Sequence, residues 1–281
     1  MKKKLRKLGM FFPTKVVLYI DFGRSYKRIL NLKKPKYFGE KIQWVKLNGN
    51  LERYSNYVDK YEVRKIIEEK IGESYLPELY GVYNDATEIR FENLPQQFVL
   101  KMTNGTGGNI ICRNKDDLDI ERTIKTLNRW KNEKFYKYTK ENQYKNVKAR
   151  IICEEYLEDE TGSLRDYKFH CSKKKVHMIE VHTDRFTDHK ENYYDPEWNE
   201  MDVVCKLGKV HHIQKPANIE KMKRLAIELS ENLPYIRIDF YSVNNRIYFG
   251  EFTFTPANGT DPMYPLSKDI ELAKVIDLGE Y

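Results

Sequence analysis

Residues 234–256 constrain the possible folds of this chain more than any other stretch. Two runs rich in aromatic and β-branched residues flank the pair Asn244-Asn245. This pattern predicts two antiparallel β-strands joined by a turn. Because side chains two positions apart share a face of a strand, Arg237 and Asp239 are expected to point the same way.

The register of this hairpin decides whether its two acids meet. A two-residue turn would place Asp239 opposite Gly250 and turn Glu251 to the other face, whereas a three-residue loop over residues 244–246 places Asp239 opposite Glu251. We predict the longer loop, together with a bulge. Adjacent acids repel each other, and a hard cation such as Mg²⁺ between them would remove the repulsion. A surface hairpin with scattered charges is the alternative.

A second motif lies earlier in the chain. Residues 98–113 have the pattern of a strand, a glycine-rich loop and another strand. Because the loop does not open a helix, it fits neither the Walker loop nor the dinucleotide fingerprint. The amides of a glycine-rich hairpin can still approach phosphate oxygens closely, and Lys101 can reach the same phosphates as a point charge.

The two motifs, in this order, resemble the ATP-grasp superfamily. Arg-Ile-Asp-Phe-Tyr at 237–241 and Glu-Phe-Thr-Phe-Thr-Pro at 251–256 are similar to its metal-binding hairpin. Together with Asp-Tyr-Lys-Phe at 166–169, they resemble a TupA-like branch associated with surface-polysaccharide synthesis more than the D-alanine–D-alanine ligase branch. The resemblance implies an α+β ATP-grasp fold, in which two α+β subdomains clasp ATP after a small, mostly helical N-terminal region.

The resemblance also implies boundaries and roles. The N-terminal region would span residues 1–75, the subdomain with the glycine-rich loop residues 76–150, and the subdomain with the metal-binding hairpin residues 151–281. Arg237 and Lys168 would be catalytic. The residues implied in ATP binding are Lys101, Asn104, Gly105, Thr106, Gly107, Gly108, Glu154, Glu155, Tyr156, Leu157 and Lys168, of which residues 154–157 would form the hinge that holds adenine.

Two magnesium ions would be held by Asp239, Glu251 and Thr253. The superfamily usually has Asn at the position of Thr253. A hydroxyl can ligate Mg²⁺, as in the phosphate loop, but more weakly. Asn258, in the polar loop after the hairpin, is therefore the alternative ligand.

The apolar spacing over residues 57–72 predicts one amphipathic helix that ends at Gly72. In the family that the chain resembles, this helix precedes the nucleotide-binding domain. Asp59, Lys60 and Arg64 would then lie near the cleft, and a surface helix end is the alternative for each of them.

The activity that the resemblance implies is that of an ATP-dependent, ADP-forming carboxylate–amine ligase, which forms an amide through an acyl phosphate. Its partners would be an amine and a carboxylate, such as a sugar acid or glycan precursor of capsule or cell-wall polysaccharide. A glycosyltransferase is one alternative, although no Asp-x-Asp motif lies at a suitable strand end. A non-catalytic nucleotide-binding protein is another, because Thr253 is a weak ligand. No nucleic-acid partner is expected, since the basic and aromatic residues 116–144 match no RNA-binding module.

Composition adds a few constraints. The chain has 50 Lys and Arg against 42 Asp and Glu, a formal charge of +8, which suits an anionic ligand. Its four cysteines include no Cys-x-x-Cys pair, so we expect them to be reduced and structural in a cytoplasmic protein. The six histidines have no Ser or Asp partner at a catalytic spacing and are expected on strands or at the surface.

The N-terminus is basic, with lysines at residues 2–4 and aromatic residues at 11 and 12. Pro13 and Lys15 interrupt the apolar run that follows, which is too short to span a bilayer. Two interpretations stay open: a solvated first turn, and a peripheral contact with the anionic inner face of a membrane.

Overall fold

The structure, a computed structural model, describes residues 7–159, 162, 164–185, 187–210 and 212–281. Its strands are β1 (Leu79–Tyr83), β2 (Phe98–Met102), β3 (Asn109–Cys112), β4 (Ile151–Glu155), β5 (Asp166–Ser172), β6 (Lys175–Thr183), β7 (Lys190–Tyr194), β8 (Tyr235–Val243) and β9 (Arg246–Thr253). Its α-helices are α2 (Thr14–Tyr26), α3 (Phe38–Asn48), α4 (Ser55–Val58), α5 (Glu62–Lys70), α6 (Ile120–Lys131), α7 (Phe135–Thr139), α8 (Ile219–Leu229) and α9 (Leu266–Ala273).

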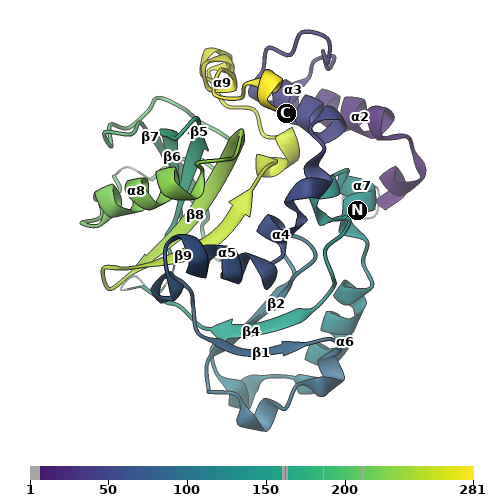
Figure 1. The fold of residues 1–281 in the computed structure, drawn as a ribbon, viewed down its shortest axis with the longest axis vertical. Coiled ribbons are helices and arrows are strands. Elements are labelled where there is room, and N and C mark those ends of the chain that lie inside the picture. The colour runs from purple at the N-terminus through teal and green to yellow at the C-terminus, as the bar shows by residue number, and fades with distance from the viewer. Residues whose placement is uncertain (1–6, 160–161, 163, 186, 211) are drawn as a thin grey trace.

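The strands form two antiparallel sheets. One has four strands in the order β1-β4-β2-β3, and the other has five in the order β7-β6-β5-β8-β9. Figure 1 shows the two sheets one above the other, with α4 and α5 drawn between them. The architecture is α+β with a mostly helical N-terminal region, as the sequence predicted.

Each sheet has its own hydrophobic core. The core of the four-stranded sheet includes Phe98 and Leu100 of β2 and Leu127 of α6. Helix α6 begins after Asp119, whose carboxylate accepts a hydrogen bond from the Arg122 amide at 2.9 Å, and its buried face covers this sheet. The core of the five-stranded sheet includes Met222 of α8, which lies against β5 and β6.

The change from one sheet to the other falls between β4 and β5, because β4 pairs with β1 and β2. The boundaries at 75/76 and 150/151 stay predictions. All four cysteines are free, and three of them are buried.

The predicted single helix over residues 57–72 is wrong. The chain forms α4 and α5 instead, separated by a turn at Asp59. The Asp59 carboxylate accepts hydrogen bonds from the amides of Tyr61 and Glu62 at 2.8 and 3.3 Å, which favours a new helix start over continuation. Arg150 of the loop before β4 holds the other Asp59 oxygen at 2.8 Å. The break therefore ties the N-terminal region to the four-stranded sheet.

The predicted three-residue loop of the β8–β9 hairpin is also wrong. Val243 pairs directly with Arg246, so the loop consists of Asn244 and Asn245 alone. Both have positive φ, 50° and 61°, which is the backbone of a tight turn that Asn tolerates well. With this two-residue loop and no bulge, Glu251 would point to the opposite face of the sheet from Asp239.

A bulge at Gly250 restores the predicted pairing. Phe240 pairs with Phe249 while Asp239 pairs with Glu251, so Gly250 is the extra residue on β9. A Cβ at this position would lie 3.0 Å from the Asp239 carbonyl oxygen, so glycine is suited to the close approach. The predicted meeting of the two acids is confirmed.

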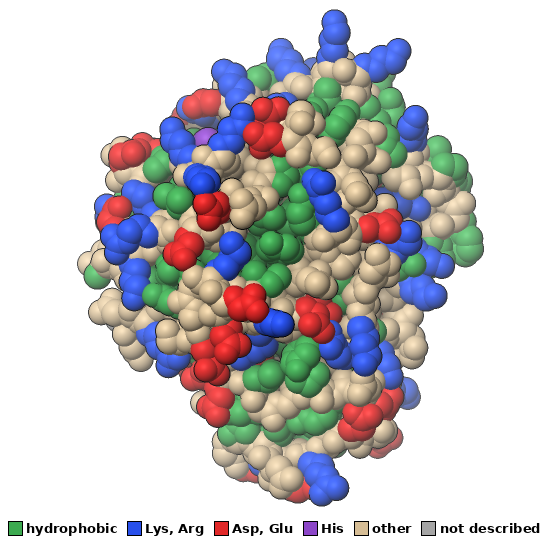
Figure 2. All heavy atoms as spheres, viewed as in Figure 1, with side chains coloured by type: hydrophobic (Ala, Val, Ile, Leu, Met, Phe, Trp, Pro, Cys, Tyr) green, Lys and Arg blue, Asp and Glu red, His purple; other side chains and the backbone are tan. Residues whose placement is uncertain are grey.

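Charge is spread over the visible surface. Figure 2 shows Lys and Arg side chains interspersed with Asp and Glu side chains around a hydrophobic central strip. Within the described part of the chain, no helix is both long and apolar enough to cross a membrane. Residues 1–6 lie outside the described residues, and both interpretations of the N-terminus, a solvated first turn and a membrane contact, stay open. Nearby, the side chains of Phe11 and Phe12 are exposed.

Candidate active site

One face of the five-stranded sheet carries a row of charged side chains. Lys168 of β5 pairs with Glu180 of β6 on one side and with Asp239 of β8 on the other. Asp239 in turn pairs with Glu251 of β9. Because directly paired residues share a face, these four side chains extend from β6 to β9 on the same side of the sheet.

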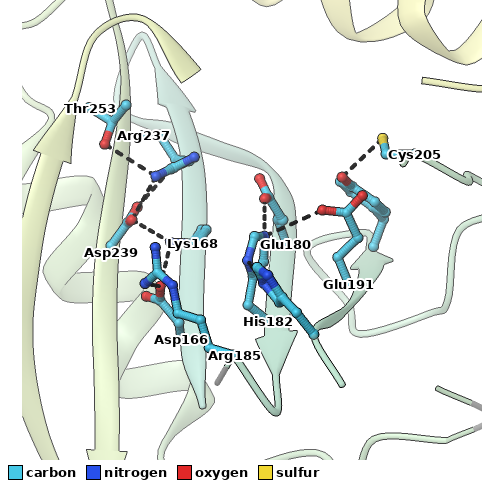
Figure 3. A network of polar contacts seen from close by, with 12 residues as sticks. Asp166, Lys168, Glu180, His182, Arg185, Glu191, Cys205, Arg237, Asp239 and Thr253 are labelled. Carbon is cyan, nitrogen blue, oxygen red and sulfur yellow. Dashed lines mark hydrogen bonds and ion pairs between the residues drawn. The ribbon is translucent and has the colours of Figure 1, made fainter. Parts of the chain in front are cut away.

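Asp239 is held by two cations. Lys168 Nζ lies 2.6 Å from its Oδ2, and Arg237 forms a two-pronged contact, with Nε and a terminal nitrogen each at 2.8 Å. Figure 3 shows Arg237 and Lys168 converging on this carboxylate. Burial alone would raise the pKa of Asp239, but Arg237 and then Lys168 outweigh it and lower the pKa. Asp239 is therefore ionised.

Arg237 also reaches the partner strand. Its terminal nitrogen donates to Thr253 Oγ1 at 3.2 Å and lies 3.7 Å from Glu251 Oε1. The three predicted metal ligands therefore surround one guanidinium. Glu251 keeps 36% of its side chain exposed, whereas Asp239 is almost fully buried.

Lys168 has a second carboxylate partner, Asp166, at 2.5 Å from Nζ. Arg185 donates to the same Asp166 oxygen at 3.0 Å. Asp166 was not among the predicted site residues. Its position two residues before Lys168, on the same face of the strand, was the sequence signal that could have found it.

The four-stranded sheet supplies a second charged group. Lys101 Nζ lies 2.7 Å from Glu154 Oε2, and Arg64 holds the other Glu154 oxygen at 2.7 Å. Both oxygens of Glu154 thus bind cations, and the predicted contact with adenine stays a prediction. Arg64 comes from α5, and its predicted position near a nucleotide cleft stays a prediction.

Lys60 binds the glycine-rich loop. Its Nζ donates to the Gly105 carbonyl oxygen in the glycine-rich loop at 2.7 Å. Burial lowers the pKa of Lys60, the charge of Glu251 opposes this shift, and Lys101 adds to it. The loop, the Lys101 group and the hairpin therefore lie within electrostatic reach of one side chain.

The glycine-rich loop is a hairpin, as predicted. The Met102 amide donates to the Gly108 carbonyl oxygen at 2.8 Å, and Gly107 has φ +73°, which non-glycine residues rarely adopt. Asn104, Gly105, Thr106, Gly107 and Gly108 all line one side of a small cavity of about 70 Å³. The far side of that cavity is formed by side chains from the region of α6 and α7.

The remaining hinge residues lie at the end of β4. The Glu155 carboxylate accepts a hydrogen bond from the Glu78 amide at 3.3 Å. Arg113 lies over the Tyr156 ring at 6.0 Å. Leu157 follows in the connection that leads from the four-stranded sheet to β5. Adenine binding by residues 154–157 stays a prediction.

The family described as TupA-like ATPgrasp matches residues 40–277. The chain belongs to this family. No curated protein matches it.

Solved structures include similar folds at low identity. D-alanine–D-alanine ligase from Bacillus anthracis is 15% identical with a TM-score of 0.47, over 78% of this chain and 63% of that one. The ATP-grasp ligase PsnB complexed with minimal precursor, Mg and ADP is 13% identical with a TM-score of 0.40, over 76% and 56%. N5-carboxyaminoimidazole synthase from Aspergillus clavatus is 12% identical with a TM-score of 0.41, over 70% and 44%. The chain spans less than two thirds of each of these proteins.

The oxygen donors of this TupA-like ATP-grasp protein fit a hard cation. Asp239, Glu251 and Thr253 offer oxygen only, which is the donor set that Mg²⁺ prefers. The alternative ligand Asn258 is engaged elsewhere, because its Oδ1 accepts a hydrogen bond from Lys46 Nζ at 2.7 Å. Thr253 Oγ1 also accepts a hydrogen bond, but from Arg237, which contacts both acids. The choice between Thr253 and Asn258 as ligand stays a prediction.

A polar cluster on β6 and β7 was missed by the sequence reasoning. His170 and His182 both bind the Glu180 carboxylate, His170 with its Nε2 at 3.0 Å from Oε2 and His182 with its Nε2 against Oε1. Glu191 of β7 pairs with His182, and its Oε2 lies 3.6 Å from His182 Nε2. The signal was Glu180 and His182 at i and i+2 on one strand. The partner strand that carries Glu191 could not be inferred from spacing. His211 lies outside the described residues.

The cluster and the charged row share one cavity of about 210 Å³, lined by Lys168 and Arg237 as well as by Glu180 and Glu191. Burial raises the pKa of Glu191 to about 7, and the nearby carboxylate of Glu180 adds to the shift. The Leu207 amide and the Tyr193 hydroxyl oppose it. One wall of the cavity is thus rich in cations, and the other is rich in carboxylates.

Proposed function

We propose that this protein is an ADP-forming, ATP-dependent ligase that joins a carboxylate to an amine. The observation that carries the proposal is the pairing of Asp239 with Glu251 across β8 and β9, with Arg237 in contact with both acids. Lys168 approaches the same Asp239 from β5. This arrangement supplies fixed cations and oxygen ligands at one point of a sheet, which phosphoryl transfer requires.

The nucleotide would lie between the two sheets. Lys101 and the amides of the glycine-rich loop would contact its phosphates, as phosphate-binding loops do. Lys60, which binds the loop carbonyl of Gly105 and faces the charge of Glu251, would hold the loop toward the hairpin. The hinge over residues 154–157 would receive the adenine.

Asp239, Glu251 and Thr253 would hold the magnesium, which when bound supplies charge neutralisation for the phosphates. The protein's own part of that task falls to Arg237 and Lys168. Both are buried, and both are oriented by Asp239 before any substrate binds. Preorganised cations of this kind stabilise negative charge as it develops in the transition state.

The proposed reaction has two steps. A carboxylate oxygen of the first substrate attacks the γ-phosphorus of ATP, ADP leaves, and an acyl phosphate results. The nitrogen of the amine then attacks the carbonyl carbon, the bond from that carbon to the phosphate oxygen breaks, and phosphate and one proton leave. Arg237 and Lys168 line the cavity of about 210 Å³ in which the acyl group would lie.

The proposed carboxylate is a sugar acid or a glycan precursor of capsule or cell-wall polysaccharide, made in the cytoplasm. Support comes from membership of the TupA-like family, whose branch is associated with surface polysaccharides. The cavity volume suits a substrate group the size of one sugar or amino acid rather than a whole polymer.

The proposal is tested by product analysis. Purified protein is incubated with Mg²⁺, ATP and pooled sugar acids and amines, and the nucleotide products and new amides are identified by mass spectrometry. Release of ADP and phosphate that depends on both an acid and an amine supports the ligase. Release of AMP, or turnover of a sugar nucleotide without ATP, contradicts it. ATP binding without any turnover would favour the non-catalytic alternative.

A further inference from the structure

Three buried side chains with metal-ligating atoms meet on β6 and β7. Glu180, His182 and Glu191 each offer one ligand atom, and these atoms lie within 4.8 Å of one another. None of the three residues is more than 9% exposed. The sheet fixes their positions, because His182 pairs directly with Glu191 and Glu180 precedes His182 by two residues on the same strand.

Burial would raise the pKa of Glu180, but His182 and His170 outweigh it and lower the pKa, so the uncompensated carboxylate of the cluster is that of Glu191. Glu191 Oε1 is buried and has no hydrogen-bond partner among the described residues, and its side chain lines the cavity. The Lys and Arg side chains that line the same cavity bind other acids: Lys168 and Arg237 are hydrogen-bonded to Asp239, and Arg185 to Asp166. Burying ionised carboxylates without a cation is costly. A buried carboxylate oxygen that has no partner and lines a cavity is open to a ligand, and a cation there would offset its charge.

We propose that Glu180, His182 and Glu191 bind a divalent first-row transition-metal ion of the Zn²⁺ type. One imidazole nitrogen and two carboxylate oxygens are suitable donors for such an ion, and three protein ligands leave positions open to the cavity. Two ligands at about 2.1 Å in tetrahedral geometry lie about 3.4 Å apart. His182 Nε2 and Glu191 Oε2 lie 3.6 Å apart.

The surroundings of His182 fit a metal ligand. His189 Nε2 lies 2.8 Å from His182 Nδ1, so a neutral His182 can donate its Nδ1–H to His189 and present Nε2 to the ion. Metal-bound histidines usually donate their other N–H in this way. The ion would replace the hydrogen that now joins His182 Nε2 to Glu180. His170 would keep its hold on the second Glu180 oxygen.

This site is separate from the proposed magnesium site. Asp239 lies on β8, two strands from β6, which corresponds to about 10 Å at the usual strand spacing. The magnesium ligands are oxygens alone, whereas this site includes an imidazole, which suits transition metals. The proposal holds whether or not the chain is a ligase.

The test uses full-length protein stripped with EDTA and kept in excess Mg²⁺, which occupies hard-oxygen sites. Zn²⁺ is added, the free metal is removed by gel filtration, and the retained metal is measured by mass spectrometry. About one equivalent of Zn²⁺ is expected. Co²⁺ as a second probe is expected to give the visible absorption of nitrogen and oxygen coordination. Failure of the wild-type protein to retain either ion overturns the proposal.

Variants locate the retained ion. His182→Gln and Glu191→Gln are each expected to weaken Zn²⁺ binding at least a hundredfold, and His189→Phe about tenfold to a hundredfold as a neighbour of a ligand. His177→Gln is the matched control, because His177 lies on the same strand but binds Ser172, and it should retain the ion. Circular dichroism checks that each variant is folded. Unchanged binding in folded His182→Gln and Glu191→Gln, or loss in Glu251→Gln instead, contradicts the assignment.

Discussion

Two regions of one sheet face, the charged row at β8 and the polar cluster on β6 and β7, place their buried carboxylates in different surroundings. On β8, Asp239 receives three hydrogen bonds from Lys168 and Arg237, and its pKa is lowered despite burial. On β7, Glu191 is also buried, but an imidazole is its nearest basic group and one of its oxygens is unpaired. Its pKa is raised to about 7 by burial and by the charge of Glu180. Burial is common to both acids, so neighbouring cations account for the difference.

This contrast separates what the protein completes by itself from what it leaves for a ligand. The region at β8 holds Arg237 and Lys168 in place before any substrate arrives, as a preorganised site for phosphoryl transfer should. At β6 and β7, two histidines bind Glu180, but Glu191 keeps one buried oxygen without a hydrogen-bond partner among the described residues. The same sheet face therefore combines a finished electrostatic site with one that a cation would complete.

The largest expected effect is that of Asp239→Asn. Turnover should fall to background, and the free energy of unfolding should fall by about 3 kcal/mol or more, because two buried cations lose their shared counter-charge. The sequence alone, which shows no ion pair, would predict a nearly unchanged melting temperature. Urea unfolding and an ADP-release assay measure both effects.

The control for this variant is Asp277→Asn, which removes the carboxylate of an exposed ion pair with Lys173. Its melting temperature and turnover should match the wild-type values. If Asp239→Asn unfolds at the wild-type urea concentration, the region at β8 is not held together by this carboxylate, and the contrast with β7 fails.

The next effect concerns the bulge. In Gly250→Val, the new side chain would meet the Asp239 carbonyl oxygen, at 3.0 Å from its Cβ, and the Tyr241 ring, at 3.2 Å. We expect a loss of about 1–3 kcal/mol in stability from overpacking and a larger loss of turnover, because Glu251 leaves its position opposite Asp239. Gly250→Ala should show a smaller loss of both. Wild-type turnover in Gly250→Val would show that the bulge does not position the acids.

Thr253 gives a finer test of the same region. Thr253→Val removes the hydroxyl, and a loss of about 1.4 kcal/mol would raise the Mg²⁺ concentration for half-maximal turnover about tenfold. Thr253→Asn restores an oxygen ligand of the kind usual in the superfamily and should leave that concentration equal or lower. A Mg²⁺ titration of the ADP-release rate distinguishes them. Equal Mg²⁺ requirements in all three proteins would remove Thr253 from the ligand set.

The sequence predicted the hairpin and the meeting of its acids because strand periodicity fixes which residues share a face. It placed the extra residue wrongly, in the loop instead of at Gly250. A two-residue turn with a bulge and a three-residue loop give the same pairing of Asp239 with Glu251, and spacing cannot distinguish them. The split between α4 and α5 was hidden for a similar reason, since apolar spacing continues through Asp59 while its carboxylate binds the amides that follow.

The cluster on β6 and β7 was hidden for a different reason. Glu180 and His182 are visible as a pair within one strand, but Glu191 belongs to another strand, which pairs through a loop of unpredictable length. The contacts of Asp166 and Arg185 at the Lys168 site were hidden for the same reason. They depend on how the strands pair and on how far the side chains extend. Local periodicity predicts which side chains of one strand share a face. Which strands lie side by side, and so which of these side chains meet, depends on the topology of the sheet.

The smallest expected effect tests the polar cluster on β6 and β7 directly. In EDTA-treated protein at pH 8, Glu191→Gln should leave the free energy of unfolding unchanged or raise it by about 1 kcal/mol after solvent screening, because it removes a charge that repels Glu180. The direction of this change in stability follows from the linkage between proton binding and folding. A carboxyl whose pKa is raised in the folded state stabilises that state while protonated, and this contribution is lost as pH rises through about 7.

The advantage of Glu191→Gln over the wild type should therefore grow between pH 5 and pH 8, as urea unfolding at several pH values would show. Asp239→Asn should lose stability under the same conditions, because its pKa is lowered and its charge is compensated. Zn²⁺ should reverse the order, since a metal ion would stabilise the wild type and not Glu191→Gln. A marked loss of stability in metal-free Glu191→Gln would mean that the wild-type carboxylate already has a cationic partner, and the two regions of the sheet face would then be alike.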